Sequence, residues 1–166
     1  MIVRAASPTD AQAICDIWNP IIRDTTVTFT DEAKTPPAIS DLIKLRAGAF
    51  LVAEHGGKVG GFATYFAFRG GSGYLRSKEL SINLAPDMRG QGMGRALINA
   101  LEAHAREQGV HSLIGAVSSE NPAGQTFHHQ LGYRHIATLP EVGFKFGRYI
   151  DLILMQKILT STDDIS

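Results

Sequence analysis

The chain has 166 residues, 44% of them hydrophobic, and its 16 basic and 16 acidic side chains leave a formal net charge of zero. This length can bury a core without disulfides or metals, and the balanced charge favours neither nucleic acid nor an anionic membrane as a partner. The single Cys15 cannot form an internal disulfide, and no apolar run reaches 18 residues. We expect one cytoplasmic domain, residues 1–159, followed by a polar tail, residues 160–166.

The first part of the chain predicts one strand and two helices. Residues 2–4 are expected to form a strand, and Ser-Pro-Thr-Asp at 7–10 marks the start of a helix that runs to about Arg23. Two prolines open a second helix over residues 36–48. The segment 25–29 is β-prone but short, so we expect a loop between the two helices.

The middle of the chain predicts three strands. Residues 50–54 and 58–68 read as a hairpin around His-Gly-Gly, and a glycine-rich loop follows at 70–73. The next strand alternates over residues 79–84, with leucine and isoleucine on one face and Glu79, Ser81 and Asn83 on the other.

The last part alternates helices with strands. A helix from about Gly92 to Gly109 precedes a buried strand at 113–117, and Asn121 caps a helix that Gly132 closes. The final strands are expected at 134–139 and 149–157. This alternation predicts one mixed α/β sheet.

The most informative motif lies where the strand of Glu79 gives way to a helix. Alternate glycines let the backbone turn with positive φ, and a helix N-terminus directs free N–H groups and a positive dipole end to an anion. Flanking arginines add charge-assisted contacts. We predict a pyrophosphate cradle formed by Arg89, Gly90, Gln91, Gly92, Met93, Gly94 and Arg95.

Spacing separates this motif from two other phosphate loops. A dinucleotide-binding turn requires glycine where Arg95 stands, and a Walker A loop requires Gly-Lys-Ser/Thr, which this motif lacks. The pattern R-G-x-G-x-G resembles the acetyl-coenzyme A signature of the GNAT superfamily of N-acetyltransferases. The segments at 25–29, 131–133, 138–143 and 145–148 resemble the phosphinothricin and methionine sulfoximine acetyltransferases within it.

The resemblance implies a fold and a donor site. We expect a mixed, mostly antiparallel sheet of about seven strands with four flanking helices, and two parallel strands that splay apart at the cofactor. Acetyl-CoA would meet the backbone of Ile82, Asn83 and Leu84, and Asn121 would hydrogen bond its pantetheine arm. The resemblance also implies a homodimer.

The chemistry of amine acetylation points to Glu79. An amine attacks only when neutral, and a free α-amino group has a pKa of about 8, so a base assists at neutral pH. A carboxylate on a mostly apolar central strand costs free energy to bury, so it indicates either an ion-pair partner or a catalytic role. The family places its presumed general base at this position. The alternative is an ion pair with Lys78, Arg76 or Arg69.

A second residue is expected to protonate the departing thiolate of coenzyme A. Asn121 and His128 are seven residues apart, which brings them to one face of a helix. Many GNAT enzymes place a tyrosine at the position of His128 to protonate the leaving thiolate, and histidine can do the same. The alternatives are a plain N-cap for Asn121 and a packed core histidine for His128.

The resemblance places the acceptor near Phe29, Arg69, Tyr74 and Arg76, where a guanidinium would pair with an amino acid carboxylate. The chain departs from the subgroup at four positions. Relatives commonly have arginine, arginine, histidine and tyrosine where this chain has Gly71, Leu75, Leu80 and Asn83.

These observations predict an acetyl-CoA dependent N-acetyltransferase acting on a small amino acid or analogue by direct attack in a ternary complex. Acetylation of a protein N-terminus or a polyamine is one alternative, and a non-catalytic coenzyme A binding regulator is another. The spacing of His, Cys and acidic residues predicts no metal site. We expect a small-molecule amine as the partner, with no nucleic acid or membrane.

Overall fold

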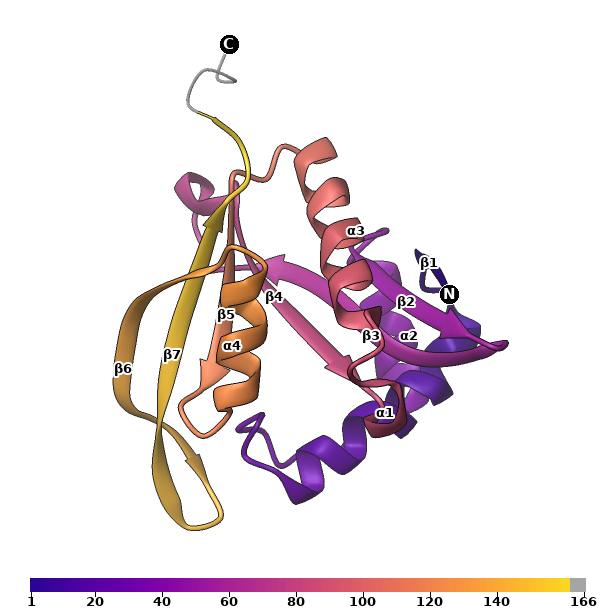
Figure 1. Ribbon diagram of the computed structural model, residues 1–166, viewed down its shortest axis with the longest axis horizontal. Coiled ribbons are helices and arrows are strands. Elements are labelled where there is room, and N and C mark those ends of the chain that lie inside the picture. The colour runs from indigo at the N-terminus through magenta and orange to yellow at the C-terminus, as the bar shows by residue number, and fades with distance from the viewer. Residues whose placement is uncertain (162–166) are drawn as a thin grey trace.

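A single twisted sheet organises the part of the chain that the computed structural model describes, residues 1–161 (Figure 1). The strand order is β1-β2-β3-β4-β5-β7-β6. Its strands are β1 (Ile2–Ala5), β2 (Phe50–His55), β3 (Lys58–Ala67), β4 (Ser77–Leu84), β5 (Ser112–Ser118), β6 (Arg134–Lys145) and β7 (Arg148–Ile158). Neighbouring strands are antiparallel except β4 and β5, which are parallel.

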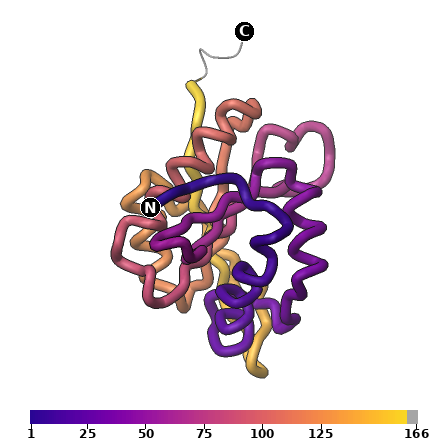
Figure 2. The backbone as a smooth tube through the Cα atoms, turned by 90° about the vertical axis from the view of Figure 1, so that its right-hand side faces the viewer, coloured from indigo at the N-terminus to yellow at the C-terminus, as the bar shows by residue number. Residues whose placement is uncertain are grey.

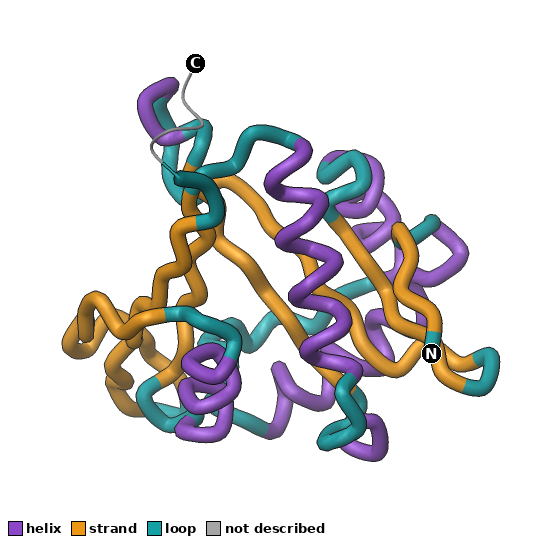
Figure 3. Tube along the Cα trace, turned by 45° about the horizontal axis from the view of Figure 1, so that its top comes forward, coloured by secondary structure: helices purple, strands orange, loops and turns teal. Residues whose placement is uncertain are grey.

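Helices cover both faces of this sheet. The α-helices are α1 (Ala11–Asp24), α2 (Pro36–Leu45), α3 (Met93–Glu107) and α4 (Pro122–Gln130), and short 3-10 turns lie at Pro8–Asp10, Ser72–Tyr74 and Pro86–Met88. Figure 2 views the sheet from its β1 edge, with α1 and α2 on one side, and Figure 3 shows α3 crossing the opposite face. The seven-stranded mixed sheet with four α-helices confirms the predicted fold.

Alternation along the strands divides the apolar core in two. In β2, Phe50 and Val52 pack with residues of α1 and α2, whereas Leu51 and Ala53 pack with residues of α3 such as Leu97. A strand places successive side chains on opposite faces, so this pattern orients the sheet. The face toward α1 and α2 is the one that carries the candidate site.

The parallel strands β4 and β5 separate partway along their length. Their pairing runs from Ser77 and Ser112 to Leu80 and Gly115 and then stops, although both strands continue. Beyond that point, residues 81–84 pair with β3 alone. The backbone on the β5 side of this stretch therefore faces an opening, as the predicted splay requires.

The last hairpin is longer than the sequence suggested. We expected a strand at 134–139, but β6 continues through Pro140 and Gly143 to Lys145. A register shift between Leu139 and Gly143 absorbs these residues, and Glu141 takes a positive φ of 56° inside it. The bulge lets the strand resume its pairing with β7. Most of the expected tail, residues 162–166, lies outside the described residues.

Candidate active site

Two joined cavities lie beside the splayed strands, each of about 550 Å³. We call the first the Glu79 cleft, since Glu79 lines it, and the second the glycine-loop cleft, since Gly90, Gly92 and Gly94 line it. The residues that line both are Val27, Ile82, Asn83, Asn121 and His128. A molecule bound in one cavity can therefore reach a molecule bound in the other.

The glycine-loop cleft has the form that the motif predicted. Gly90 and Gly92 take positive φ values of 73° and 82°, and Gly92 is the N-cap of α3. Beyond the adjoining residues of the chain, no atom of the described structure lies within 4 Å of an ideal Cβ at either glycine, so the loop backbone is open to a ligand. At Gly94 a Cβ would come within 2.9 Å of the Phe127 ring, so the close packing of α3 and α4 requires glycine there.

The predicted cofactor residues divide into two groups. The residues that line the cavity are Ile82, Asn83, Leu84, Arg89, Gly90, Gly92, Gly94, Arg95 and Asn121. Gln91 instead donates a hydrogen bond to the Asp87 carbonyl at 2.8 Å, which closes the loop on itself. Met93 is buried in the core. These two side chains support the loop and do not line the cavity.

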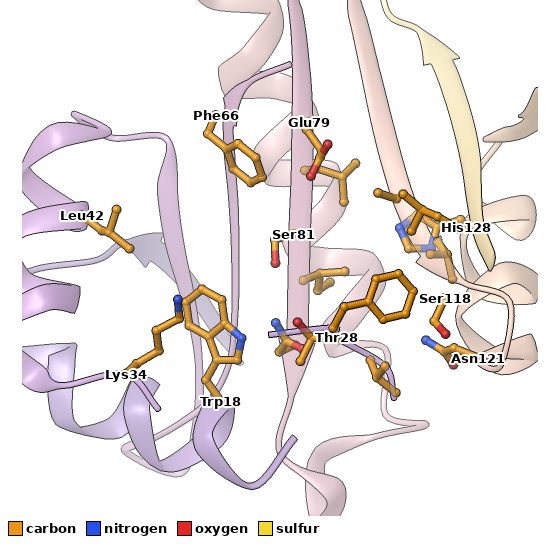
Figure 4. A pocket seen from close by; sticks show the side chains of 18 of the residues that line it. Trp18, Thr28, Lys34, Leu42, Phe66, Glu79, Ser81, Ser118, Asn121 and His128 are labelled. Carbon is orange, nitrogen blue, oxygen red and sulfur yellow. The ribbon is translucent and has the colours of Figure 1, made fainter. Parts of the chain in front are cut away.

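Glu79 is a half-buried carboxylate in the cleft that bears its name. It is paired across the strands with Phe66, and Figure 4 shows it above Ser81 on the same strand. Within residues 1–161 it forms no ion pair or hydrogen bond, so the alternative of a salt bridge to Lys78, Arg76 or Arg69 is not realised. Burial disfavours the charged form and raises the pKa of Glu79.

His128 lies on the opposite wall of the cleft (Figure 4). It is only 6% exposed, and its Nδ1 lies 2.7 Å from the Gly124 carbonyl oxygen. Because a carbonyl can only accept, Nδ1 carries the proton and Nε2 has a free lone pair. Nε2 is buried without a partner in the described structure. Burial lowers the pKa of His128, which favours the neutral ring.

Asn121 caps α4 as the sequence predicted. Its Oδ1 accepts a hydrogen bond from the Gly124 N–H at 3.0 Å, and Pro122 takes the first helical position. The side chain also lines both clefts, so its amide nitrogen can donate to a ligand. Capping and ligand contact are compatible in this geometry.

The structure does not bring all four residues predicted to bind the acceptor into one cavity. Phe29 lines the Glu79 cleft. Arg69, Tyr74 and Arg76 line neither cavity, and all three are exposed in or beside the loop between β3 and β4. The Arg69 guanidinium stacks over the Tyr74 ring at 5.0 Å.

Several lining residues carried no functional signal in the sequence. Trp18 belongs to the apolar stripe of α1, and Arg46 looks like a cation placed to suit the C-terminus of α2. The lining residues that sequence analysis did not single out include Trp18, Lys34, Arg46, Phe66 and Ser118. They come from five separate segments, so only the fold brings them together.

Lys145 secures the loop that carries Phe29. It is 3% exposed, and its Nζ donates to the carbonyl oxygens of Ile22 and Thr25 at 2.6 Å and of Thr28 at 2.8 Å. Phe29 packs against Gly143, where a Cβ would lie 2.5 Å from its ring. The β6–β7 hairpin therefore fixes one wall of the Glu79 cleft.

Comparison with known proteins agrees with this geometry. The acetyltransferase (GNAT) family profile matches residues 12–133. An L-amino acid N-acyltransferase of Escherichia coli is 34% identical over 159 residues, covering 94% of this chain and 92% of its own. A phosphinothricin N-acetyltransferase of Alcaligenes faecalis is 36% identical, covering 97% and 84%.

Solved structures share the whole fold. An acetyltransferase of Salmonella typhimurium, solved with its cofactor acetyl-CoA, superposes with a TM-score of 0.92 at 32% identity, covering 97% of this chain and 95% of its own. A ribosomal-protein-alanine N-acetyltransferase of Brucella melitensis superposes with a TM-score of 0.91 at 35% identity, covering 95% and 99%. With the joined clefts, these similarities define an acetyl-CoA dependent N-acetyltransferase. The chain belongs to the GNAT acetyltransferase family.

Two further observations concern the part of the chain that is described. No helix within it is long and apolar enough to cross a membrane. No group of three or more His, Cys, Asp or Glu side chains within it is arranged to hold a metal ion.

Proposed function

We propose that this enzyme acetylates the amine of a small amino acid or amino acid analogue by direct attack in a ternary complex. The observation that carries the proposal is an unpaired, half-buried carboxylate, Glu79, in a cleft that opens into the glycine-loop cleft. One cavity would hold the donor and the other the acceptor, so no acyl-enzyme is needed.

The glycine-loop cleft suits the donor. Open backbone at Gly90 and Gly92, the N-terminus of α3 and the side chains of Arg89 and Arg95 together favour a pyrophosphate. Acetyl-CoA supplies an acetyl group activated as a thioester when it is bound there. The backbone of residues 82–84 is paired with β3 but not with β5, so its β5 side can receive the pantetheine arm. An N–H group on that side can donate to a carbonyl oxygen that gains negative charge.

Glu79 is proposed as the general base. An ammonium acceptor must lose a proton before it can attack, and a carboxylate with a raised pKa accepts that proton more readily than an exposed one. Glu79 projects between the walls carrying Phe66 and His128, so an amine bound there can meet it directly or through water (Figure 4).

His128 is proposed to act first as a proton acceptor, through Nε2. Its single proton lies on Nδ1, held by the Gly124 carbonyl, and its Nε2 lone pair is free. It can therefore give a proton to the leaving sulfur, the role expected from the sequence, only after Nε2 has received one. A thiol of pKa about 8.5 leaves readily near neutrality, so this step is worth less than deprotonation of the amine.

The names of the relatives support the acceptor class. They include methionine sulfoximine/methionine sulfone acetyltransferases and phosphinothricin N-acetyltransferases, which are similar to this chain along most of its length. The Brucella melitensis neighbour is named a ribosomal-protein-alanine N-acetyltransferase, which keeps a peptide acceptor as the second candidate. An unpaired Glu79 argues against a non-catalytic regulator, because cofactor binding alone does not need it.

An acceptor screen tests the proposal. Thiol release from acetyl-CoA would be followed with free amino acids, their sulfone, sulfoximine and phosphinate analogues, polyamines and short peptides. We expect the highest kcat/KM for an amino acid or analogue. A clear preference for a peptide or a polyamine would refute the proposed acceptor class, and no turnover with any amine would favour the regulator.

We also propose that the enzyme is a homodimer. The β6–β7 hairpin carries large apolar side chains that are exposed in the single chain, which marks it as an interaction surface. These are Ile136, Leu139, Val142, Phe144, Phe146 and Tyr149. A cytoplasmic setting stays a prediction, and it suits a buried thiol at Cys15 that has no disulfide partner.

A further inference from the structure

Arg46 is set apart from the other arginines of the structure by its pairing and burial. Four arginines form ion pairs with carboxylates, and the remaining ones other than Arg46 are exposed. Arg46 is half-buried, lines the Glu79 cleft and has no carboxylate partner within residues 1–161. A desolvated cation without a counter-ion is costly unless a ligand supplies the anion.

The Arg46 guanidinium is held in a fixed position. Its Nη1 donates to Thr64 Oγ1 at 3.1 Å, and the Thr64 hydroxyl in turn donates to the Ala49 carbonyl at 2.7 Å. The guanidinium stacks over the Phe66 ring at 4.8 Å. A guanidinium has five N–H donors, so several remain after this hydrogen bond. The side chain thus turns from the end of α2 toward the sheet and does not cap the helix.

The strand register places this cation next to the proposed base. Thr64 pairs with Ser81 and Phe66 pairs with Glu79 across β3 and β4, so the four side chains share one face of the sheet. Directly opposed side chains have Cβ atoms about 5 Å apart. Arg46 contacts Thr64 and Phe66 on β3. Its guanidinium therefore lies against the strand that neighbours the strand of Glu79.

The two opposite charges nevertheless do not meet. Both line the same cleft, yet they form no ion pair, so their charged atoms are more than 4.0 Å apart. An α-amino acid carries its amine and its carboxylate on one carbon, separated by two covalent bonds. Such a molecule can present its amine to Glu79 and its carboxylate to Arg46 at once.

We infer that Arg46 binds the carboxylate of the acceptor and selects α-amino acids for the site, an inference that rests on the proposed function. It replaces Arg69 and Arg76, which the sequence suggested for this role and which line neither cavity. Lys34 also lines the cleft, but its Nζ lies over the Trp18 ring at 4.8 Å, away from the Phe66–Glu79 pair in Figure 4.

The test can use binding as well as turnover, because the only tryptophan of the chain, Trp18, lines the same cleft. Its fluorescence reports occupancy without catalysis. L-methionine sulfone and its amide would be titrated into the wild type and into Arg46→Gln, and kcat/KM would be measured for both acceptors. We expect the wild type to prefer the acid by about ten- to a hundredfold, as for loss of a charge-assisted hydrogen bond.

In Arg46→Gln the acid should lose that advantage while the amide binds as before. Arg46→Lys should keep part of the preference for the acid, since lysine retains the positive charge but lacks the planar set of N–H donors of a guanidinium. Lys44→Gln, an exposed change on the same helix, is the control and should keep the full preference. Thermal melting would confirm that each variant folds.

Several results would overturn the inference. These are a wild type that does not distinguish acid from amide, an Arg46→Gln that keeps the preference, and a preference that disappears in Arg69→Gln or Lys34→Gln instead. The proposed function fails separately. If Arg46→Gln abolishes selective binding of the acid but the wild type acetylates no amino acid or analogue, the inference about Arg46 survives and the proposed reaction does not.

Discussion

The Nδ1 nitrogen of His128 lies 2.7 Å from the carbonyl oxygen of Gly124, one helical turn earlier in α4. This contact decides the chemistry of the ring, because it assigns the proton to Nδ1 and leaves Nε2 as a buried acceptor. The N–H group of the same residue, Gly124, donates to the Asn121 side chain that caps the helix. The cap and the tautomer are therefore parts of one local structure.

The first prediction concerns that tautomer. Burial lowers the pKa of His128, so the ring should stay neutral at pH 7 and protonate only below the usual value of about 6.5. Nitrogen-15 NMR of histidine-labelled protein, with His128→Gln for assignment, would show a neutral ring protonated at Nδ1. A doubly protonated ring at pH 7, or a proton on Nε2, would contradict this assignment.

The second prediction concerns the glycine loop. Gly92→Val should weaken acetyl-CoA binding by tenfold or more, because a β-branched residue at φ 82° is strained and its side chain would enter the space left for phosphates. Calorimetry measures the affinity. Gly109→Val is the matched control, since Gly109 has a φ of 76° at the end of α3 and lines neither cavity. Equal cofactor affinity in the two variants would refute the predicted role of the loop.

The third prediction concerns Lys145. Lys145→Met removes three charge-assisted hydrogen bonds and leaves carbonyl oxygens of the 25–29 loop without their donor. We expect a loss of about 2 to 4 kcal/mol in the free energy of unfolding and a higher KM for the acceptor. Chemical denaturation and kinetics would measure both. Lys58→Met removes only an exposed ion pair with Asp87 and should cost less than about 1 kcal/mol.

A Lys145→Met variant as stable as the Lys58→Met control would show that the loop is held by other contacts. A variant that loses stability but keeps the acceptor KM would show that Lys145 supports the fold and does not shape the cleft.

The fourth prediction concerns the apolar hairpin. Phe144 and Tyr149 lie on β6 and β7 with ring centroids 5.1 Å apart, and both are exposed in the single chain. Replacing both with aspartate should convert the proposed dimer to a monomer in analytical ultracentrifugation. Leu45→Asp changes an exposed apolar residue on α2 and should leave the assembly unchanged. A monomeric wild type would contradict the dimer.

Local sequence signals predicted much of this fold. The proline pair at 36–37, the Asn121 cap and the alternation around Glu79 each depend on a few neighbouring residues, so they could be interpreted without a structure. The glycine loop is also a local feature, since its positive φ values follow from residue type. The extent of β6 could not be predicted, because a bulge carries the strand past Pro140.

The acceptor side of the site was harder to predict for a different reason. Trp18, Arg46 and Phe66 come from α1, the end of α2 and β3, and each has an ordinary explanation in its own element. Their shared role depends on long-range strand register and on how α1 and α2 lie across the sheet. Arg69 had the expected residue type near the expected place, but the loop after β3 carries it outside the cleft.

The role of Glu79 as the base is tested by a pH series of kcat/KM for the wild type, Glu79→Gln and His128→Phe with one amino acid acceptor. Since burial raises the pKa of Glu79, the base form accumulates only above that raised pKa, and the wild-type rate should climb at a higher pH than an exposed glutamate would give.

At pH 7, Glu79→Gln should lower kcat/KM by about 10² to 10⁴, and the deficit should shrink as pH rises and the amine loses its proton in solution. His128→Phe should lose less at every pH. If Glu79→Gln keeps a near-normal rate at pH 7 while His128→Phe is crippled, the base is His128 and the central assignment is wrong. If neither variant is impaired, the cleft around Glu79 is not where the amine reacts.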